Sequence, residues 1–374
     1  MAYARKYDRA FLITIVFLVL FGFFELSSAS LGLTARGDKN SYIILFKQMA
    51  IGGAGFFLFF LCSKIPYKKW KTFAIPIFIA SFLLTLLVLE NKFGLSSSHG
   101  GAKRWLNIGP FTLQPSEFLK LAFVIYLSSW LSRRQNEIGS FKTGVLPFLV
   151  MAGFVSAALI LQPDFGTLGI ILITAAILFF LAGAKWKHMA LIFVLGPALV
   201  IGLAYGSSHF SCLKDFSHLK KRIDIFLNPS KDTQDSGYQL YQMKTAIGSG
   251  GIFGKGFGDG TSKFNFLPEP IGDSIFAVIG EEFGFIGTLF LSGLFVFLFL
   301  KCIRISIRAP DSFGRLLAAG LGIIIVIQAF INMYASVGLI PLTGVPLTFI
   351  SQGGSALIFN LAEAGIIFNI SNNC

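Results

Sequence analysis

Residues 273–300, DSIFAVIGEEFGFIGTLFLSGLFVFLFL, form an apolar run of 28 residues that begins at an aspartate. An α-helix rises about 1.5 Å per residue, so a run of this length crosses the ~30 Å hydrocarbon core of a bilayer. The rest of the chain is similar in character: 54% of its 374 residues are hydrophobic, 13% are charged, and the mean hydropathy is +0.74. One globular core cannot hide this much apolar surface, so the sequence predicts an integral membrane protein.

Nine further runs have the length and composition of membrane-spanning helices. The ten predicted spans cover residues 10–31, 42–62, 72–90, 115–131, 145–162, 165–184, 188–206, 273–300, 315–338 and 345–370. The sequence therefore predicts an all-α, polytopic membrane protein in which residues 1–374 form a single domain. The first run lacks a small-residue cleavage site, so we expect it to stay in the protein as a signal anchor.

Lysine and arginine residues gather in alternate short loops, which is typical of cytoplasmic loops. This distribution predicts that both termini are cytoplasmic and that the protein is a multi-pass component of the cytoplasmic membrane. It places residues 91–114 and the turn at 162–166 outside. It also predicts one large extracytoplasmic loop, at about residues 207–272, before the eighth helix.

The net charge of +13 and the cysteine pattern argue against two other classes of protein. Cytoplasmic loops and anionic lipid headgroups explain the excess of lysine and arginine, and no basic motif is patterned for nucleic acid, so we expect no nucleic-acid partner. The four cysteines, Cys62, Cys212, Cys302 and Cys374, are scattered without metal-like spacing. This spacing predicts neither a disulfide framework nor a zinc site.

A glycine-rich loop, IGSGGIFGKGFGDG at residues 247–260, comes before the run that begins at Asp273. It does not fit the nucleotide-binding motifs, because Gly254-Lys255 is followed by glycine rather than serine or threonine and no G-x-G-x-x-G is present. Two interpretations stay open. Its backbone N–H groups, with Lys255 and Lys263, could hold a pyrophosphate or a lipid headgroup, or its glycines could permit tight packing of an outer loop.

Asp273 follows the turn-forming residues PEPIG at 268–272 and stands at the start of the predicted helix. Aspartate is a favoured N-cap residue, so a purely structural role is one interpretation. The other is a general base at the outer leaflet, where partial burial raises its pKa towards a useful range. Glu281 and Glu282, further along the same helix, must face protein, water or a cation, because acids are costly in lipid.

Residues 101–121, GAKRWLNIGPFTLQPSEFLKL, combine cations with an aromatic side chain. Lys103 and Arg104 attract phosphate, and Trp105 suits the membrane interface, where it could also serve only as a belt residue. Glu117 and Lys120 are spaced i, i+3 in the next predicted helix and can neutralise each other. A structural ion pair and a ligand site are both open for these two residues.

Five motifs in this order resemble the shape, elongation, division and sporulation (SEDS) family of peptidoglycan polymerases over essentially the whole chain. They are GAKRWLNIGPFTLQPSEFLKL (101–121), QPDFGT (162–167), AIGSGGIFGKGFG (246–258), FLPEPIGDSIFAVIGEEFGFIG (266–287) and PLTGVPLTFISQGGSAL (341–357). Two of their details, IGEEFGFIG and the spacing of GFGDGTSKFNFLPE, are more similar to the division members (FtsW) than to the elongation members (RodA).

The resemblance implies a peptidoglycan glycosyltransferase that polymerises lipid II into β-1,4 glycan strands at the outer face of the cytoplasmic membrane during division or elongation. It implies an inverting reaction that releases undecaprenyl pyrophosphate. Asp273 matches the family's essential acid and is the predicted catalytic residue. A divalent cation, Mg²⁺ or Mn²⁺, is left open as a cofactor, with Asp273 as its ligand. The predicted substrate-binding residues are Lys103, Arg104, Trp105, Glu117, Lys120, Lys255, Lys263, Glu269 and Ser351.

The implied partners are lipid II, the nascent glycan strand, a class B penicillin-binding protein docked through its transmembrane helix, and other divisome or elongasome proteins. The chain departs from the family in two places: Ile271-Gly272 replace the usual His-Thr before the acid, and Gln352 replaces the tyrosine of Ser-Tyr-Gly-Gly. A lipid II flippase or transporter and a non-catalytic division scaffold are the alternative functions. The polymerase is favoured because the acid and the cations concentrate on one outer face.

Overall fold

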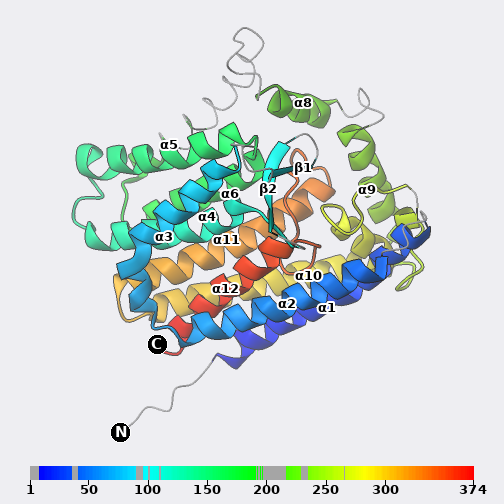
Figure 1. Ribbon diagram of the computed structural model, residues 1–374, viewed down its shortest axis with the longest axis horizontal. Coiled ribbons are helices and arrows are strands. Elements are labelled where there is room, and N and C mark those ends of the chain that lie inside the picture. Colours follow the sequence, from blue (N-terminus) through cyan, green and yellow to red (C-terminus); the bar gives the residue numbers. More distant parts are fainter. Residues whose placement is uncertain are drawn as a thin grey trace.

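The structure is a computed structural model that describes residues 8–35, 41–89, 96–99, 102–108, 111–190, 192, 194, 196, 216–228, 235–264 and 266–374. Long helices lie side by side in one bundle, and a small sheet, α8 and α9 lie at the end of the bundle away from the C-terminus (Figure 1). The helices are α1 (Arg9–Ala35), α2 (Ser41–Lys64), α3 (Tyr67–Leu87), α4 (Pro115–Arg133), α5 (Leu146–Leu161), α6 (Phe165–Leu181), α8 (Phe216–Leu227), α9 (Ser236–Gly250), α10 (Ile275–Arg308), α11 (Ser312–Ser336) and α12 (Gly354–Ser371).

The predicted class, a helical polytopic membrane protein, is confirmed. Seven helical segments among the described residues are long and apolar enough to cross a membrane; they lie in α1, α2, α3, α10, α11, α12 and in α5 together with the π-helical turn Phe141–Val145 before it. The helices α4 and α6 match two more of the predicted spans. The predicted span 188–206 lies almost entirely outside the described residues.

The predicted span 345–370 is wrong at its start, because α12 begins only at Gly354. Residues 341–353 are irregular: Pro346 cannot donate a helical hydrogen bond, and Gly344 has a φ of 70°. Irregular backbone at membrane depth is tolerated where it is buried in protein or lines a cavity. Val345, Leu347 and Ile350 are buried, so this segment fits that condition.

A three-stranded antiparallel sheet departs from the predicted all-α class. It comprises β1 (Ser96–His99), β2 (Ala102–Ile108) and β3 (Phe111–Leu113) in the order β1-β2-β3, with Leu106 opposite Leu113. A Gly-Pro dipeptide at 109–110 separates β2 from β3, and such dipeptides mark turns. The sheet leads directly into α4, so it fixes Arg104 and Trp105 beside the end of the bundle.

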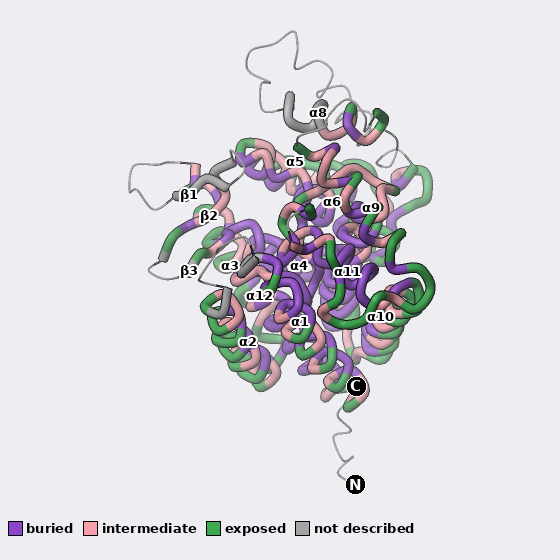
Figure 2. Tube along the Cα trace, turned by 90° about the vertical axis from the view of Figure 1, so that its right-hand side faces the viewer, coloured by how far each residue is buried: buried purple, intermediate pink, exposed green. Residues whose placement is uncertain are grey.

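The core of the bundle is built on α4, α11 and α12. These helices are buried along most of their length, whereas α2, α3 and α10 have many exposed residues (Figure 2). The exposed residues include large apolar side chains such as Phe57, Phe73 and Phe290. An apolar outer surface around a packed interior is the arrangement that a lipid bilayer requires.

The two ends of the described chain lie at the same end of the bundle. Asp8, just before α1, pairs with Lys301 in the last turns of α10 at 3.2 Å. The thiol of Cys374 contacts Ile305 in the same turns. The turn that precedes α10 therefore lies at the opposite end, together with the sheet and α9.

Candidate functional site

Asp273 lies on a turn, residues 269–274, that leads into α10. The N–H groups of Gly272 and Ser274 both donate to the Glu269 carbonyl oxygen, at 3.1 and 3.2 Å. The N-cap residue of α10 is Ser274, and no side chain accepts a capping bond there. The interpretation of Asp273 as an N-cap is therefore wrong, and its side chain lines a pocket instead.

The pocket has a volume of about 70 Å³ and is formed by α8, α9, α11, the turn before α10 and the irregular segment 341–353. Arg222 enters it from α8, and its Nη1 donates to the Thr343 carbonyl oxygen at 3.1 Å. A Cβ placed on Gly344 would lie 3.5 Å from Asp273 Oδ2 and 3.8 Å from Arg222 Nη2. The acid and the guanidinium thus both line this pocket and both approach the same point beside the Gly344 backbone.

The pKa of Asp273 is raised from 3.8 to about 6, and burial is the largest cause. The Glu269 carboxylate contributes to the rise, because a second negative charge disfavours ionisation, while Arg222 and Arg104 oppose it by favouring the charged form. An acid with a pKa just below neutral is ionised at pH 7 and still basic enough to accept a proton.

Arg104 on β2 does not line the pocket but lies close enough to act on the charge of Asp273. Its Nε donates to the Gln162 carbonyl oxygen at 3.1 Å, another guanidinium nitrogen donates to the Pro163 carbonyl oxygen, and Nη1 lies 3.9 Å from Asp164 Oδ1. Asp164 is itself fixed, because it accepts from Ser116 Oγ at 2.9 Å and caps α6 through the Thr167 N–H. Arg104 is thus held on the turn between α5 and α6, within electrostatic reach of Asp273.

The other predicted residues of the segment 101–121 lie in two different places. Trp105 is half-buried on β2, next to Arg104. The side chain of Lys103 lies outside the described residues. Glu117 and Lys120 are buried inside the bundle, 2% and 1% exposed, and they form an ion pair of 2.8 Å.

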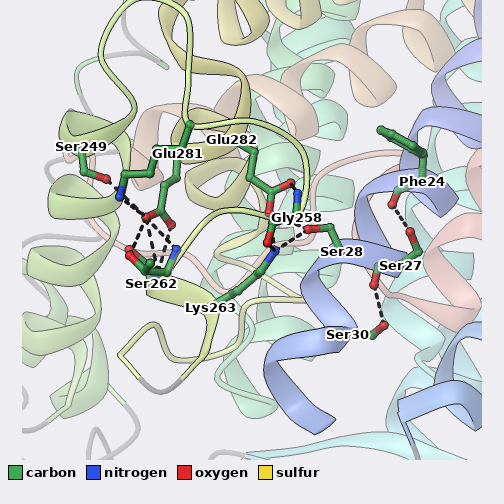
Figure 3. Close-up of polar contacts among 12 residues, drawn as sticks. Phe24, Ser27, Ser28, Ser30, Ser249, Gly258, Ser262, Lys263, Glu281 and Glu282 are labelled. Carbon is green, nitrogen blue, oxygen red and sulfur yellow. Dashed lines mark hydrogen bonds and ion pairs between the residues drawn. The ribbon is translucent and has the colours of Figure 1, made fainter. Parts of the chain in front are cut away.

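Lys255 and Lys263 form ion pairs with the two glutamates of α10 (Figure 3). Lys255 Nζ lies 2.6 Å from Glu281 Oε1, and Lys263 Nζ lies 2.6 Å from Glu282 Oε1. Lys263 is fully buried and also donates to Ser28 Oγ on α1 at 2.7 Å. Substrate binding by these lysines stays a prediction; the contacts described here tie the glycine-rich loop to α1 and α10.

The glycines of this loop permit close packing against α10. A Cβ on Gly250 would overlap the Gly280 carbonyl oxygen, and one on Gly254 would overlap the Glu282 carbonyl oxygen. The helix is interrupted at Gly284, whose φ is 65°, and the loop supplies replacement partners: the Phe285 N–H donates to the Gly251 carbonyl oxygen at 2.9 Å. Of the two interpretations of the loop, tight packing is the one that these contacts support.

Glu269 and Ser351 both belong to the surroundings of Asp273. Glu269 is exposed and begins the turn that carries the acid. Ser351 accepts from the Leu347 N–H and donates to the Gly272 carbonyl oxygen, both at 2.8 Å. Ser351 therefore ties the irregular segment 341–353 to the Asp273 turn.

Arg222 is the residue of the pocket that the sequence interpretation missed. It lies in α8, FSHLKKRIDIFL, a stretch in which charges alternate with spaced apolar residues, as in helices that lie on lipid headgroups. The sequence does hold a signal for Arg222. It follows two lysines and precedes Ile223 and Ile225, so it stands at the edge of the apolar face of the helix.

Among the described residues, no three acidic, histidine or cysteine side chains come together in a group that could hold a metal ion by themselves. Asp273 and Glu269 are two neighbouring carboxylates on one turn. Protein sites for Mg²⁺ commonly use one or two carboxylates together with substrate phosphates. The donor set beside the pocket fits an ion shared with a phosphate-bearing substrate.

Fold and site thus define a polytopic membrane protein with a half-buried, arginine-flanked acid at one end of its bundle. The family model described as "Cell cycle protein" (FtsW/RodA/SpoVE) matches residues 8–374. The chain is 36% identical over 367 residues to a probable peptidoglycan glycosyltransferase FtsW of Geobacter sp. (strain M18), covering 98% of this chain and 96% of that protein. It is 35% identical over 364 residues to stage V sporulation protein E of Bacillus subtilis, covering 97% and 96%.

Solved structures show the same fold. A chain of a peptidoglycan synthase complex, from work on the structural coordination of polymerization and crosslinking, superimposes with a TM-score of 0.80 at 25% identity, covering 98% of both chains. The rod shape determining protein RodA of Thermus thermophilus gives a TM-score of 0.70 at 24% identity, covering 98% of this chain and 97% of that one. The chain belongs to the FtsW/RodA/SpoVE family, which is the SEDS family, as its motifs predicted.

Proposed function

We propose that this chain, a peptidoglycan glycosyltransferase of the SEDS family, polymerises lipid II into β-1,4 glycan strands by an inverting reaction with Asp273 as the general base. The observation that carries this proposal is the meeting of Asp273 with Arg222 in one pocket, with Arg104 on the adjacent turn. One carboxylate and two guanidinium groups are the charges that transfer of a sugar from a pyrophosphate requires.

In this reaction the 4-hydroxyl oxygen of the acceptor sugar attacks the anomeric carbon of the donor. Asp273 accepts the hydroxyl proton, the new C–O bond forms, and the bond from the anomeric carbon to the pyrophosphate oxygen breaks. The pyrophosphate leaves with that electron pair as undecaprenyl pyrophosphate. One displacement on an α-linked donor inverts the centre and gives the β-1,4 bond without a covalent sugar intermediate.

Arg222 and Arg104 neutralise the charge that grows on the departing pyrophosphate. Guanidinium groups suit this role, because their planar donors match phosphate oxygens and they stay charged at physiological pH. When a divalent cation, Mg²⁺ or Mn²⁺, is bound, Asp273 and Glu269 are the residues that would hold it with the pyrophosphate, and the ion would add further charge neutralisation.

The site belongs on the extracytoplasmic side of the cytoplasmic membrane in this proposal. The distribution of lysine and arginine supports cytoplasmic termini, and both described chain ends lie at the end of the bundle away from Asp273. Cys374 is exposed, so its labelling by a membrane-impermeant thiol reagent added outside intact cells would contradict this orientation.

The nascent glycan strand is the second substrate in this proposal, and cross-linking is left to a partner. A class B penicillin-binding protein, docked through its transmembrane helix, is the partner that we infer, with other divisome or elongasome proteins around the pair. The similarity to a chain of a peptidoglycan synthase complex supports this inference.

A test is to supply lipid II to the purified full-length protein together with its transpeptidase partner, and to separate the products by size. We expect glycan chains, with no movement of lipid II between the leaflets of liposomes that contain the protein. Lipid II transport without polymer would favour the flippase alternative, and neither activity would favour a scaffold.

A further inference from the structure

We propose that Gln328 and Asn332, one turn apart on α11, are positioning residues that hold the Asp273 turn in place, and that the Glu117–Lys120 pair acts on the site through Gln328. The inference rests on the proposed role of Asp273 as the base. It gives the buried pair of α4 a role that needs no contact with substrate.

Asn332 connects the Asp273 turn to the irregular segment 341–353. Its Nδ2 donates to the Asp273 carbonyl oxygen at 3.0 Å and to the Val345 carbonyl oxygen at 2.9 Å. The side chain is 2% exposed. One amide group thus uses both of its N–H donors to fix the backbone of the catalytic turn against the irregular segment 341–353.

Gln328 extends the same connection into the centre of the bundle. Its Nε2 donates to the Pro346 carbonyl oxygen at 3.2 Å, and its Oε1 accepts from Lys120 Nζ. Lys120 is paired with Glu117 at 2.8 Å. A continuous chain of polar contacts therefore runs from Glu117 on α4 to the segment that lines the pocket.

The arrangement has a physical reason. The carbonyl groups of Val345 and Pro346 belong to irregular backbone and have no helical N–H partner, and an unpaired carbonyl is costly where water is excluded. Asn332 lies four residues after Gln328, so both amides project from one face of α11 and serve consecutive carbonyls. Glu117 and Lys120 are too buried to meet a lipid headgroup directly, and Gln328 is the side chain that connects them to the pocket segment.

The experiment compares Asn332→Leu and Gln328→Met with the wild-type full-length protein, using lipid II polymerisation to measure kcat and KM separately. We expect Asn332→Leu to lower kcat about 10- to 100-fold with little change in KM, because a small misplacement of a catalytic group has a large effect on rate.

Gln328→Met should act in the same direction with a smaller loss of kcat. Lys120→Met combined with Gln328→Met should be no worse than the poorer single variant, because residues in one chain of contacts are not additive. Additive losses, or a kcat of Asn332→Leu equal to that of the wild type, would overturn the inference.

Asn369→Leu is the matched control for a general loss of stability. Asn369 is also buried, and it donates to the Ser63 carbonyl oxygen at 2.6 Å at the opposite end of the bundle. This variant should lower Tm and leave the kcat and KM of the folded protein unchanged. The variant Asp273→Ala separates the role of Asp273 as the base from the positioning role of the α11 residues. If Asp273→Ala is inactive while the α11 variants behave as the wild type, only the positioning role is wrong. If Asp273→Ala is active, both roles are wrong.

Discussion

Asp273 is kept basic by its surroundings. Burial is the main cause of its raised pKa, Glu269 adds to the shift, and two arginines limit it. The balance leaves the carboxylate ionised at neutral pH and able to accept a proton, and Arg222 remains available beside it for the leaving group.

The pH dependence of polymerisation follows from this balance. Because a general base must be deprotonated, kcat should fall as the pH drops through about 6. Glu269→Gln removes a charge that raises the pKa of Asp273. In this variant the fall of kcat at low pH should therefore occur at a lower pH than in the wild type. Arg222→Gln removes a charge that lowers this pKa, so in this variant the fall of kcat should occur at a higher pH than in the wild type. Shifts in the opposite directions, or none, would contradict the electrostatic account.

The residues of the site could be predicted only in part from the sequence. Asp273 is marked by the turn before it and the apolar run after it, and Arg104 by its place beside a tryptophan. Arg222 was missed because pairing it with Asp273 depends on how α8 folds over the bundle, which a local pattern does not specify. Gln328 and Asn332 look like ordinary polar residues of a helix until the backbone that they contact is known.

The helix α10 is the element on which the site depends. Its 34 residues would extend roughly 50 Å, more than the ~30 Å that lipid requires, so its first part can stand beside the glycine-rich loop. The break at Gly284 marks this division, and Glu281 and Glu282 lie on the side of the loop. This position explains two adjacent carboxylates in an apolar run.

The packing of the loop against α10 gives a prediction with an internal control. Gly254→Ala should lower Tm by several degrees, because its φ is 81° and a Cβ would strike the Glu282 carbonyl oxygen; the expected loss is about 1 to 3 kcal/mol. Gly248→Ala adds a Cβ in a helix with no atom within 4 Å, so its stability should be unchanged or slightly higher. Equal effects in thermal unfolding would argue that the glycines do not act through close packing.

Elements were predicted well where hydropathy decides them and poorly where packing does. The spans of α10 and α11 are readable because lipid demands long apolar runs. The start of α12 was placed too early because residues 345–353 are apolar enough for a helix but serve as buried, irregular backbone. The sheet was missed because β1 is short and polar, β3 has three residues, and the strand order depends on pairing between separate segments.

The two ends of the bundle carry different parts of the molecule. One end of the bundle carries both described chain ends, and the other carries the sheet, α9 and the Asp273 pocket (Figure 1). The buried helices α4 and α11 connect the interior to the pocket through Lys120 and Gln328. The helical membrane class could be predicted from composition alone, because it follows from the amount of apolar surface; the joining of distant helices at one pocket could not.

The most direct test of the central claim is polymerisation of lipid II by Asp273→Asn beside the wild type, with the same partner and the same amount of folded protein. Asparagine keeps the shape of the side chain and removes the base. An aspartate whose pKa is raised by folding destabilises the folded state once it is ionised, so the variant should keep or raise its Tm at neutral pH. The account predicts a folded protein that forms no glycan chains; glycan synthesis at the wild-type rate would contradict it.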